Sequence, residues 1–324
     1  MELITPKSIV VRLIADKPVR KTPYQVKGVF MKQFSDEKIV PFLDGKLRNK
    51  FLYPRVQVKI LNEQIYIVGL KEGVDPVLSL VDNVKSFNFG NITINIEKYD
   101  IEENNEQLIS TEKLLRYKFI SPWVALNKNT SGKYRTLEED EKLLYLNKLF
   151  GLNILFLSKE LGIDLKSKIF TKVYLDSLIP EKLDENGWGT FAGEVKTNFI
   201  LPNYIGIGNG ITRGFGTIYS LNSFDSLIIK KSEESLDEYK QEDINVDEEG
   251  LSFVTMEDVP IINKRKKFKK PKKGYPHNKN RRNLKNKRFK KSPSNKEQQQ
   301  TNNNDLDDDS RFNSEEYHQK QHNL

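Results

Sequence analysis

Residues 205–217 read IGIGNGITRGFGT and form the most distinctive stretch of this 324-residue sequence. Five of these thirteen residues are glycines, arranged as two Gly-x-Gly pairs with Gly210 between them. Glycine adopts positive φ and lets another backbone approach without a Cβ clash, but so many glycines cost chain entropy on folding. Successive exposed backbone N–H groups in such a loop form a concave site for anions, most often phosphate. We therefore expect a functional loop here.

Three interpretations of this loop compete. A nucleotide-binding loop is disfavoured because Gly-Lys-Ser/Thr is absent, and Arg213 stands where Gly-x-Gly-x-x-Gly needs its third glycine. Residues 217–221 also read as a strand, whereas those motifs open a helix. A glycine-rich hairpin turn without a ligand is the second interpretation. The third is a backbone-lined groove for RNA, which the planar guanidinium of Arg213 suits because it matches a phosphodiester.

A resemblance to a known family favours the RNA groove. The matching segments, in chain order, are residues 53–59 (YPRVQVK), 67–73 (IVGLKEG), 121–127 (SPWVALN), 193–198 (GEVKTN) and 199–217 (FILPNYIGIGNGITRGFGT). Together they resemble the CRISPR-associated repeat-RNA-processing endoribonucleases of the RAMP superfamily, which act in crRNA maturation. The resemblance implies a protein that binds precursor CRISPR RNA and cuts within each repeat, without metal or cofactor, leaving 2′,3′-cyclic phosphate ends. It also allows other CRISPR effector subunits as partners, and a monomer or a homodimer.

Charge divides the chain into a folded part and a tail. The formal net charge is +8 and the pI about 9.2, which favours a polyanionic partner. Residues 232–258 contain one base and eleven acids, whereas residues 264–291 contain sixteen bases and no acid. Such blocks, followed by Gln and Asn runs, bury too little apolar surface to offset ordering entropy. We expect domains at 1–104 and 105–230, followed by a disordered charged tail at 231–324. The tail either binds RNA nonspecifically or serves as a solubility or localisation appendage.

Several protein classes are excluded by composition. The sequence has no cysteine, which rules out disulfides, thiol catalysis and cysteine-ligated zinc. The first residues lack the basic and apolar regions of a signal peptide. No window approaches the roughly 18 apolar residues of a membrane span. We expect a soluble, cytoplasmic protein.

Local signals predict an α+β fold of two tandem ferredoxin-like (RRM-like) domains, the second carrying the glycine-rich loop. In the first domain, residues 22–25 (TPYQ) form a capping box that opens a helix, and Asn62-Glu63 turns a hairpin. The expected order is β-α-β-β-α-β, with strands at 8–14, 55–60, 65–68 and 92–96, preceded by 87–89, and helices at 22–34 and 75–84.

The second domain repeats this plan with the glycine loop in place of most of its second helix. A capping box at residues 136–139 opens a long helix, and Gly162 ends it as a C-cap glycine. The expected strands are 114–120, 168–174, 193–200 and 217–221.

Metal-free RNA cleavage needs a base for the 2′-hydroxyl, an acid for the departing 5′-oxygen and cations for the phosphorane charge. Histidine suits the first two roles because its pKa lies near neutrality. Members of the resembled family commonly carry a histidine between the first helix and the Tyr-Pro strand, but residues 35–53 here contain none. The three histidines, His277, His318 and His322, all lie in the predicted tail.

Lysine and tyrosine are the remaining candidates for catalysis. A lysine can act as a base when burial or neighbouring cations lower its pKa. We predict catalytic roles for Lys46, Lys50, Tyr53 and Tyr24, with Lys27 on the same helix as Tyr24. The alternative is that these basic residues only hold phosphates. The predicted RNA-binding residues are Gly206, Gly208, Asn209, Gly210, Thr212, Arg213, Gly214, Gly216, Arg48, Arg55 and Lys59.

Aromatic residues divide into core and surface candidates. Trp123, Phe199 and Phe215 fall within apolar runs, so we expect them in the core. Tyr204 at the entrance of the glycine loop is the better candidate for stacking on a base, and Trp188 has no assigned role. The sequence thus predicts a metal-independent endoribonuclease; the alternative is a non-catalytic subunit that holds CRISPR repeat RNA or guide, which the missing histidine favours.

Overall fold

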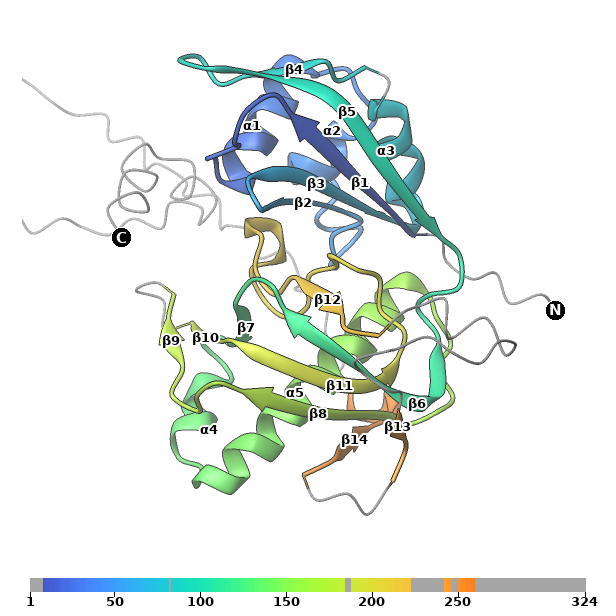
Figure 1. Ribbon diagram of the computed structural model, residues 1–324. Helices are drawn as coiled ribbons and strands as arrows, with labels where there is room; N and C mark the ends of the chain where they lie inside the picture. Colours follow the sequence, from blue (N-terminus) through green and yellow to red (C-terminus); the bar gives the residue numbers. More distant parts are fainter. Residues whose placement is uncertain (1–7, 82, 184–187, 223–241, 246–249, 260–324) are drawn as a thin grey trace, which may run out of the picture. The chain divides into compact units, whose positions relative to one another are not determined.

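The computed structural model describes residues 8–81, 83–183, 188–222, 242–245 and 250–259 (Figure 1). All of them belong to one compact unit, residues 1–263. The predicted basic run at 264–291 and the rest of the predicted tail beyond residue 259 lie outside the described residues. Within the described part, no helix combines the length and the apolar character needed to cross a membrane.

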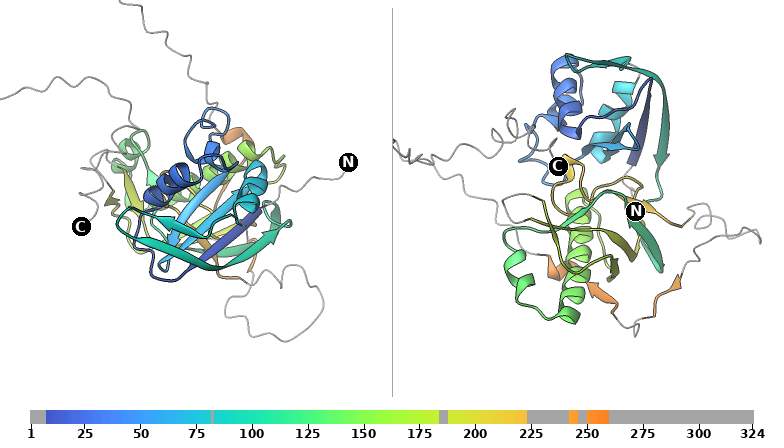
Figure 2. Two further views of the ribbon diagram at one scale, coloured as in Figure 1. Left: turned by 90° about the horizontal axis from the view of Figure 1, so that it is seen from above. Right: turned by 60° about the vertical axis from the view of Figure 1, so that its left-hand side comes forward.

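The first half of the chain forms an antiparallel sheet with its helices on one face (Figures 1 and 2). The strand order is β2-β3-β1-β5-β4. Alternate residues of β1, among them Ile9, Val11 and Leu13, pack against Phe30 of α1 and Leu80 of α3. The order β1-α1-β2-β3-α3-β5 confirms the predicted ferredoxin-like unit. Its elements are β1 (Ser8–Ala15), α1 (Pro23–Gln33), α2 (Val40–Leu43), β2 (Val56–Leu61), β3 (Gln64–Leu70), η1 (Lys71–Gly73), α3 (Val74–Val81), β4 (Ser86–Asn88) and β5 (Thr93–Asn104).

Two local signals in this half act as predicted. Thr22 caps α1, because its hydroxyl accepts a hydrogen bond from the Gln25 N–H at 3.2 Å while the Gln25 side chain accepts from the Thr22 N–H at 2.9 Å. Asn62 and Glu63 both have positive φ, which gives the tight two-residue turn of a β2–β3 hairpin. β5, in contrast, continues to Asn104, well beyond the predicted strand, because it pairs with the whole length of β1.

The second half forms a sheet of order β12-β6-β11-β8-β14, with β13 also paired to β6. α5 covers one face of this sheet. Buried Asn147 of α5 fixes the contact: its side-chain carbonyl accepts from the Val173 N–H at 2.7 Å, and its backbone carbonyl accepts from the Thr171 hydroxyl at 2.9 Å. The elements are β6 (Ser110–Phe119), β7 (Trp123–Leu126), α4 (Ser131–Arg135), α5 (Glu139–Leu161), β8 (Ile169–Leu175), β9 (Glu181–Lys182), β10 (Gly189–Phe191), β11 (Gly193–Phe199), η2 (Ile211–Arg213), β12 (Ile218–Ser220), β13 (Glu242–Asp243), β14 (Ser252–Val254) and η3 (Met256–Asp258).

The start of the long helix differs from the prediction. The Thr136 hydroxyl donates to the carbonyl of Lys133 at 2.8 Å, so Thr136 closes α4 instead of opening α5. The capping box of α5 is formed by Glu138 and Glu141 instead. The C-cap prediction is confirmed, since Gly162 has φ of 69°. A small additional sheet, β7-β10-β9, was not predicted.

The expectation that ordered structure ends near residue 230 is wrong for two short segments, residues 242–245 and 250–259. β14 adds to the edge of β8, and Val254 is fully buried against Gly151 of α5. A Cβ at position 151 would lie 2.6 Å from a Cγ of Val254, so the glycine of α5 makes room for this strand. Three strand residues within an acidic stretch give little periodic signal, which is why the sequence did not reveal them.

One hydrophobic core joins the two halves. The face of the first sheet that carries no helix contributes Val10, Tyr66 and Val68, and these belong to the same buried cluster as Tyr117 of β6 and Phe150 of α5. The sheet of the first half is therefore covered on both faces. This arrangement brings β2 and α1 against the glycine loop.

Candidate nucleic-acid interface

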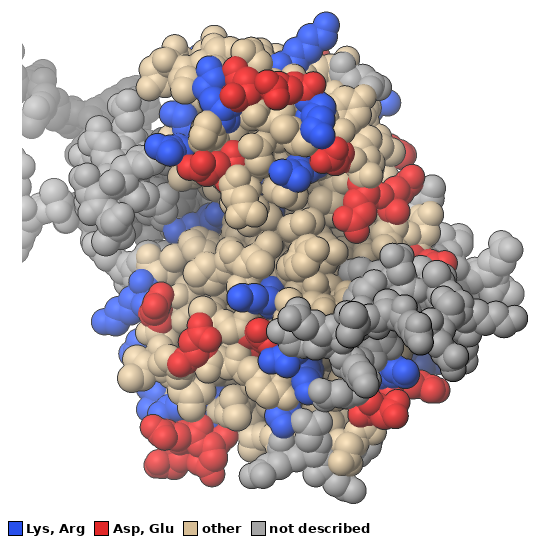
Figure 3. Space-filling model, viewed as in Figure 1, with Lys and Arg blue, Asp and Glu red and all other residues tan. Residues whose placement is uncertain are grey.

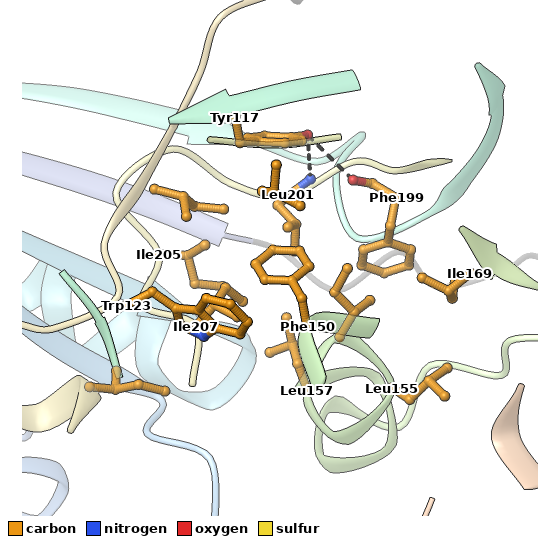
Figure 4. Close-up of a cluster of buried hydrophobic side chains, with 14 of the residues drawn as sticks. Tyr117, Trp123, Phe150, Leu155, Leu157, Ile169, Phe199, Leu201, Ile205 and Ile207 are labelled. Atoms are coloured by element: carbon orange, nitrogen blue, oxygen red, sulfur yellow. Dashed lines mark hydrogen bonds between the residues drawn. The ribbon is translucent and has the colours of Figure 1, made fainter. Parts of the chain in front are cut away.

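The glycine loop is anchored in the core through alternate side chains. Ile205, Ile207 and Ile211 are buried, and Ile205 and Ile207 point toward Trp123 and Phe150 (Figure 4). The Trp123 ring stacks on Phe119 and meets Phe150 edge-on. The prediction that Trp123 and Phe199 are core residues is confirmed. The loop is thus anchored in the core of the second half of the chain.

Two of the loop glycines are required by close backbone approach. Gly216 has φ of 64°, and a Cβ there would overlap the carbonyl oxygen of Ile207. Gly208 has φ of 94°, and a Cβ there would come within 2.7 Å of the Trp123 indole nitrogen. A side chain at either position would meet both backbone strain and a clash.

Most backbone N–H groups of the loop bond within the protein. Of the thirteen residues 205–217, nine donate to acceptors of the chain: 205, 206, 207, 209, 213, 214, 215, 216 and 217. The predicted phosphate nest therefore has few donors left in this conformation. The shape of the loop is set by its own hydrogen bonds, and Asn209 takes part, since its side-chain amide donates to Val124 O at 3.0 Å.

Arg213 lies close to two aromatic rings. Its guanidinium carbon lies 5.7 Å from the centre of the Trp188 ring and 5.4 Å from that of Phe215. Cations placed over aromatic faces in this way are attracted by the ring quadrupole. Phe215 is only half-buried, so its predicted place in the core is wrong. Sequence analysis assigned no role to Trp188; this contact indicates that Trp188 helps to position Arg213.

Tyr53 connects β2 to the loop and is not available as a catalyst. Its hydroxyl donates to Gly206 O at 2.6 Å and accepts from the Gln57 amide at 3.0 Å, while the Gln57 carbonyl accepts from the Gly206 N–H at 2.8 Å. The three groups close a ring of hydrogen bonds. Burial raises the pKa of Tyr53 well above its usual range. The predicted catalytic role of Tyr53 is therefore corrected to a structural one.

Lys59 and Lys27 are two buried lysines beside the η2 turn. Lys59 is 0% exposed, and its Nζ lies 3.4 Å from the carbonyl of Ile211. Burial, and then the charge of Lys27, lower the pKa of Lys59 to about 7. Lys27 is 7% exposed, and its Nζ donates to the carbonyl of Thr212 at 2.6 Å. Burial lowers the pKa of Lys27 to about 8.

Tyr24, one turn before Lys27 on α1, completes this group. The Lys27 Nζ lies 4.4 Å from the centre of the Tyr24 ring, and Tyr24 is half-buried. A Cβ at Gly214 would lie 2.9 Å from Pro23, so the loop runs directly past the start of α1. Thr212 is exposed at the tip of the loop.

Two of the predicted RNA-binding residues are buried: Lys59 in β2 and Arg55 directly before it. Arg55 donates to Glu72 at 2.8 Å, to Tyr53 O at 3.0 Å and to Glu160 O at 2.5 Å. The Glu160 carbonyl lies at the end of α5, where the negative helix terminus favours a cation. Both predictions are wrong because the second half of the chain covers this face of the first sheet.

Lys46, Arg48 and Lys50 are exposed in the connection between α2 and β2. Lys46 pairs with Asp44 at 3.0 Å, and Lys50 lies 5.0 Å from the Phe51 ring centre. The lysines that hydrogen-bond the glycine loop are instead Lys27 and Lys59. The signal for Lys27 in the sequence is its position one helical turn after Tyr24 on α1.

Tyr204, the predicted stacking residue, has a left-handed backbone with φ of 63°. Its ring packs between Tyr66, at 4.7 Å between ring centres, and Tyr219, at 5.4 Å. Tyr219 is 40% exposed and ends this row of rings. Among the described residues, no group of three acidic, histidine or cysteine side chains is arranged to hold a metal ion.

Comparisons with known proteins agree with this architecture. Residues 5–107 match the model of the Cas6b N-terminal domain, and residues 109–221 match that of the Cas6b C-terminal domain. An uncharacterised protein of Methanocaldococcus jannaschii is 38% identical over 115 residues, which are 35% of this chain and 77% of that protein.

Two solved structures are similar over 66% of this chain and 99% of their own. A crystal structure of Cas6b has a TM-score of 0.57 at 28% identity. A second, described as the CRISPR RNA processing endoribonuclease Cas6b, has a TM-score of 0.51 at 25% identity. The two family models together span both halves of the described chain, and we conclude that the protein belongs to the Cas6b family of CRISPR RNA-processing endoribonucleases.

Proposed function

We propose that this chain binds precursor CRISPR RNA and cuts it within each repeat, without metal, leaving 2′,3′-cyclic phosphate ends. The observation that carries the proposal is the pairing of two features at one place. Arg213 of the glycine loop lies against two aromatic rings, and Lys27 donates a hydrogen bond to the carbonyl of Thr212 in the same loop. The first can bind a phosphate and the second can move a proton.

Lys27 is the proposed proton-transfer residue. With a pKa of about 8 it holds both neutral and charged forms near neutral pH, which suits a general base or acid. The carbonyl of Thr212 occupies its Nζ in this structure. RNA bound along the loop would have to displace the η2 turn slightly for Lys27 to reach the 2′-hydroxyl. Tyr24, whose ring lies over the same Nζ, would orient it.

For the exposed lysines Lys46 and Lys50 we propose charge stabilisation instead of proton transfer. Their side chains lie outside the core and carry charge toward solvent, so they can neutralise the phosphorane or a neighbouring phosphate. Charge stabilisation of this kind is often the largest catalytic contribution. Arg48 would contribute in the same way.

A non-catalytic subunit that holds repeat RNA or guide is the second candidate. It is favoured by the absence of histidine from residues 1–276, since His277, His318 and His322 all follow the segments that match the two family models. One experiment separates the two candidates. The full-length protein is incubated in EDTA with the repeat RNA of its own locus, and with the same RNA carrying a 2′-deoxy nucleotide at the cut site.

The proposal predicts cleavage of the first RNA only, with a cyclic phosphate on the 5′ product. Lys27→Met should lower the cleavage rate by about 10²–10⁴-fold, the usual contribution of general acid–base catalysis, with little change in RNA affinity. Lys32→Met, on the exposed face of the same helix, is the matched control. Unchanged cleavage in Lys27→Met would move the site elsewhere, and no cleavage by the wild type would favour the binding subunit.

A further inference from the structure

The sheet of the second half has a face that α5 does not cover. In the first sheet, the equivalent helix-free face is buried by Val10, Tyr66 and Val68 against the rest of the molecule. In the second sheet, α5 packs on the side of Thr171 and Val173. The residues between them point to the opposite side, because side chains alternate along a strand.

Six residues of β6, β11 and β8 form two rows across this face. Strand register places Lys196 opposite both Arg116 and Lys172, and Glu194 opposite both Lys118 and Tyr174. Tyr219 of β12 pairs with Lys118 and extends the second row. We call Arg116, Lys118, Lys172, Tyr174 and Lys196 the basic sheet face. Figure 3 is viewed from this side and shows basic side chains over these strands, with acidic ones between them.

The cations gather around one tyrosine. Arg116, Lys172 and Lys196 all lie 5.5–5.6 Å from the centre of the Tyr174 ring. The Arg116 guanidinium also donates to Glu194, which holds it in place. Lys196 is 9% exposed at the centre, whereas Lys118 is exposed at the margin. A depression of about 640 Å³ lies at one end of these strands; Arg116, Lys118, Tyr174 and Glu194 line it, together with Asp176 and with Leu143 of α5.

The charge arrangement favours an extended anion. Like charges directly opposite each other on neighbouring strands destabilise a sheet, and the first row places a lysine between an arginine and a lysine. Glu194 is one carboxylate among the four cations of the two rows. An anion that crosses the strands would meet cations of both rows.

We propose that the basic sheet face binds a single-stranded RNA segment that flanks the cut site, an inference that rests on the proposed function. Phosphates would contact Lys118, Lys172 and Arg116, and a base would stack on Tyr174. Single-stranded RNA is commonly bound on open sheets of this fold by aromatic stacking and by cations that follow the backbone. An acidic protein segment would use the cations equally well but would make no use of the ring beside them.

Photo-crosslinking tests the site directly. The full chain is mixed with repeat RNA that carries ten unstructured uridines on either side, substituted with 5-iodouridine, and crosslinked peptides are identified by mass spectrometry. We expect crosslinks at Tyr174 from a flank and their loss in a Lys118→Glu/Lys172→Glu variant. The charge-matched control is Lys85→Glu/Lys166→Glu, which changes two exposed lysines elsewhere.

Affinity gives the second readout. The Lys118→Glu/Lys172→Glu variant should bind flanked RNA at least about tenfold more weakly. The slope of log K against log salt should fall by about 0.7 for each phosphate that the variant no longer neutralises. Affinity for the repeat without flanks should stay within about twofold. The urea midpoints of both variants are measured as well and should match that of the wild type, which excludes unfolding as the cause.

The outcomes separate this inference from the cleavage proposal. Crosslinks at Tyr174 without any cleavage by the wild type would overturn the proposed function but would still support RNA binding at the basic sheet face. Cleavage with crosslinks only at other sites would overturn the basic sheet face alone. An equal loss of affinity in the control variant would also overturn it, since only the net charge would then matter.

Discussion

Replacing Lys59 by methionine should stabilise the protein. Lys59 is fully buried, and its pKa falls from 10.5 to about 7. One pKa unit corresponds to about 1.4 kcal/mol, so the charged form costs on the order of 5 kcal/mol in the folded state. The long hydrogen bond to the carbonyl of Ile211 offsets about 1 kcal/mol of this. Methionine has a similar length and no charge. Because relaxation of the surrounding protein reduces such burial penalties, we expect the free energy of unfolding of Lys59→Met to exceed that of the wild type by about 1–4 kcal/mol at pH 6.

The gain should depend on pH in a defined direction. The folded pKa of Lys59 lies below the unfolded value, so the unfolded chain binds more protons between about pH 7 and pH 10.5. The stability of the wild type therefore rises with pH across this window. The difference in free energy of unfolding between Lys59→Met and the wild type is therefore largest below pH 7 and disappears toward pH 10.5. Lys27, with a pKa of about 8, adds a dependence of the same sign to both proteins.

Urea unfolding at pH 6, 8 and 10 measures this directly. Lys166→Met, at an exposed position, is the control and should change stability little at any of the three. The RNA affinity of Lys59→Met should equal that of the wild type, because Lys59 does not reach the surface. A variant less stable than the wild type at pH 6, or a gain that does not vary with pH, would refute the burial argument.

Four further predictions concern the glycine loop and the chain end. Gly216→Ala should lower the free energy of unfolding by more than about 2 kcal/mol, since it combines positive φ with a backbone clash. Gly28→Ala, in open space on α1, should instead raise it by about 0.5–1 kcal/mol. The urea midpoints of the two variants test both expectations. Arg213→Ala should weaken repeat-RNA binding by about 1–3 kcal/mol in a filter-binding assay, and unchanged affinity would make the loop structural. Truncation after residue 229 should lower stability by roughly the 1.5–3 kcal/mol of a buried valine, because it removes β14. Truncation after residue 259 should keep stability and reduce the salt slope of RNA binding, and an unchanged slope would mean that residues 264–291 do not contact RNA.

Much of the fold was predictable because its signals are local. The capping box at Thr22, the turn at Asn62-Glu63 and the C-cap at Gly162 each depend on a few adjacent residues, and each is confirmed. The resemblance to the repeat-RNA-processing family, which rests on several motifs in order, is also confirmed. The domain boundary at residues 104/105 stays a prediction.

The errors at the site have one physical cause. Arg55, Gln57 and Lys59 alternate with valines, which in an isolated sheet predicts a polar, exposed face. Here that face meets the glycine loop, some 150 residues away in sequence, and all three side chains are buried. Exposure at this position depends on contact between the halves, which periodicity does not report. Lys27 was undervalued for the same reason, since its depressed pKa arises from burial under Thr212.

The core shared by the two halves has a consequence for how the protein can be taken apart. Either half alone would expose to water the surface formed by Val10, Tyr66 and Val68, or its counterpart around Tyr117. The two ferredoxin-like units are thus one cooperative folding unit, although they look like repeats. A single unfolding transition should be seen by both calorimetry and tryptophan fluorescence, and fragments cut between β5 and β6 should aggregate when produced separately but recover when refolded together.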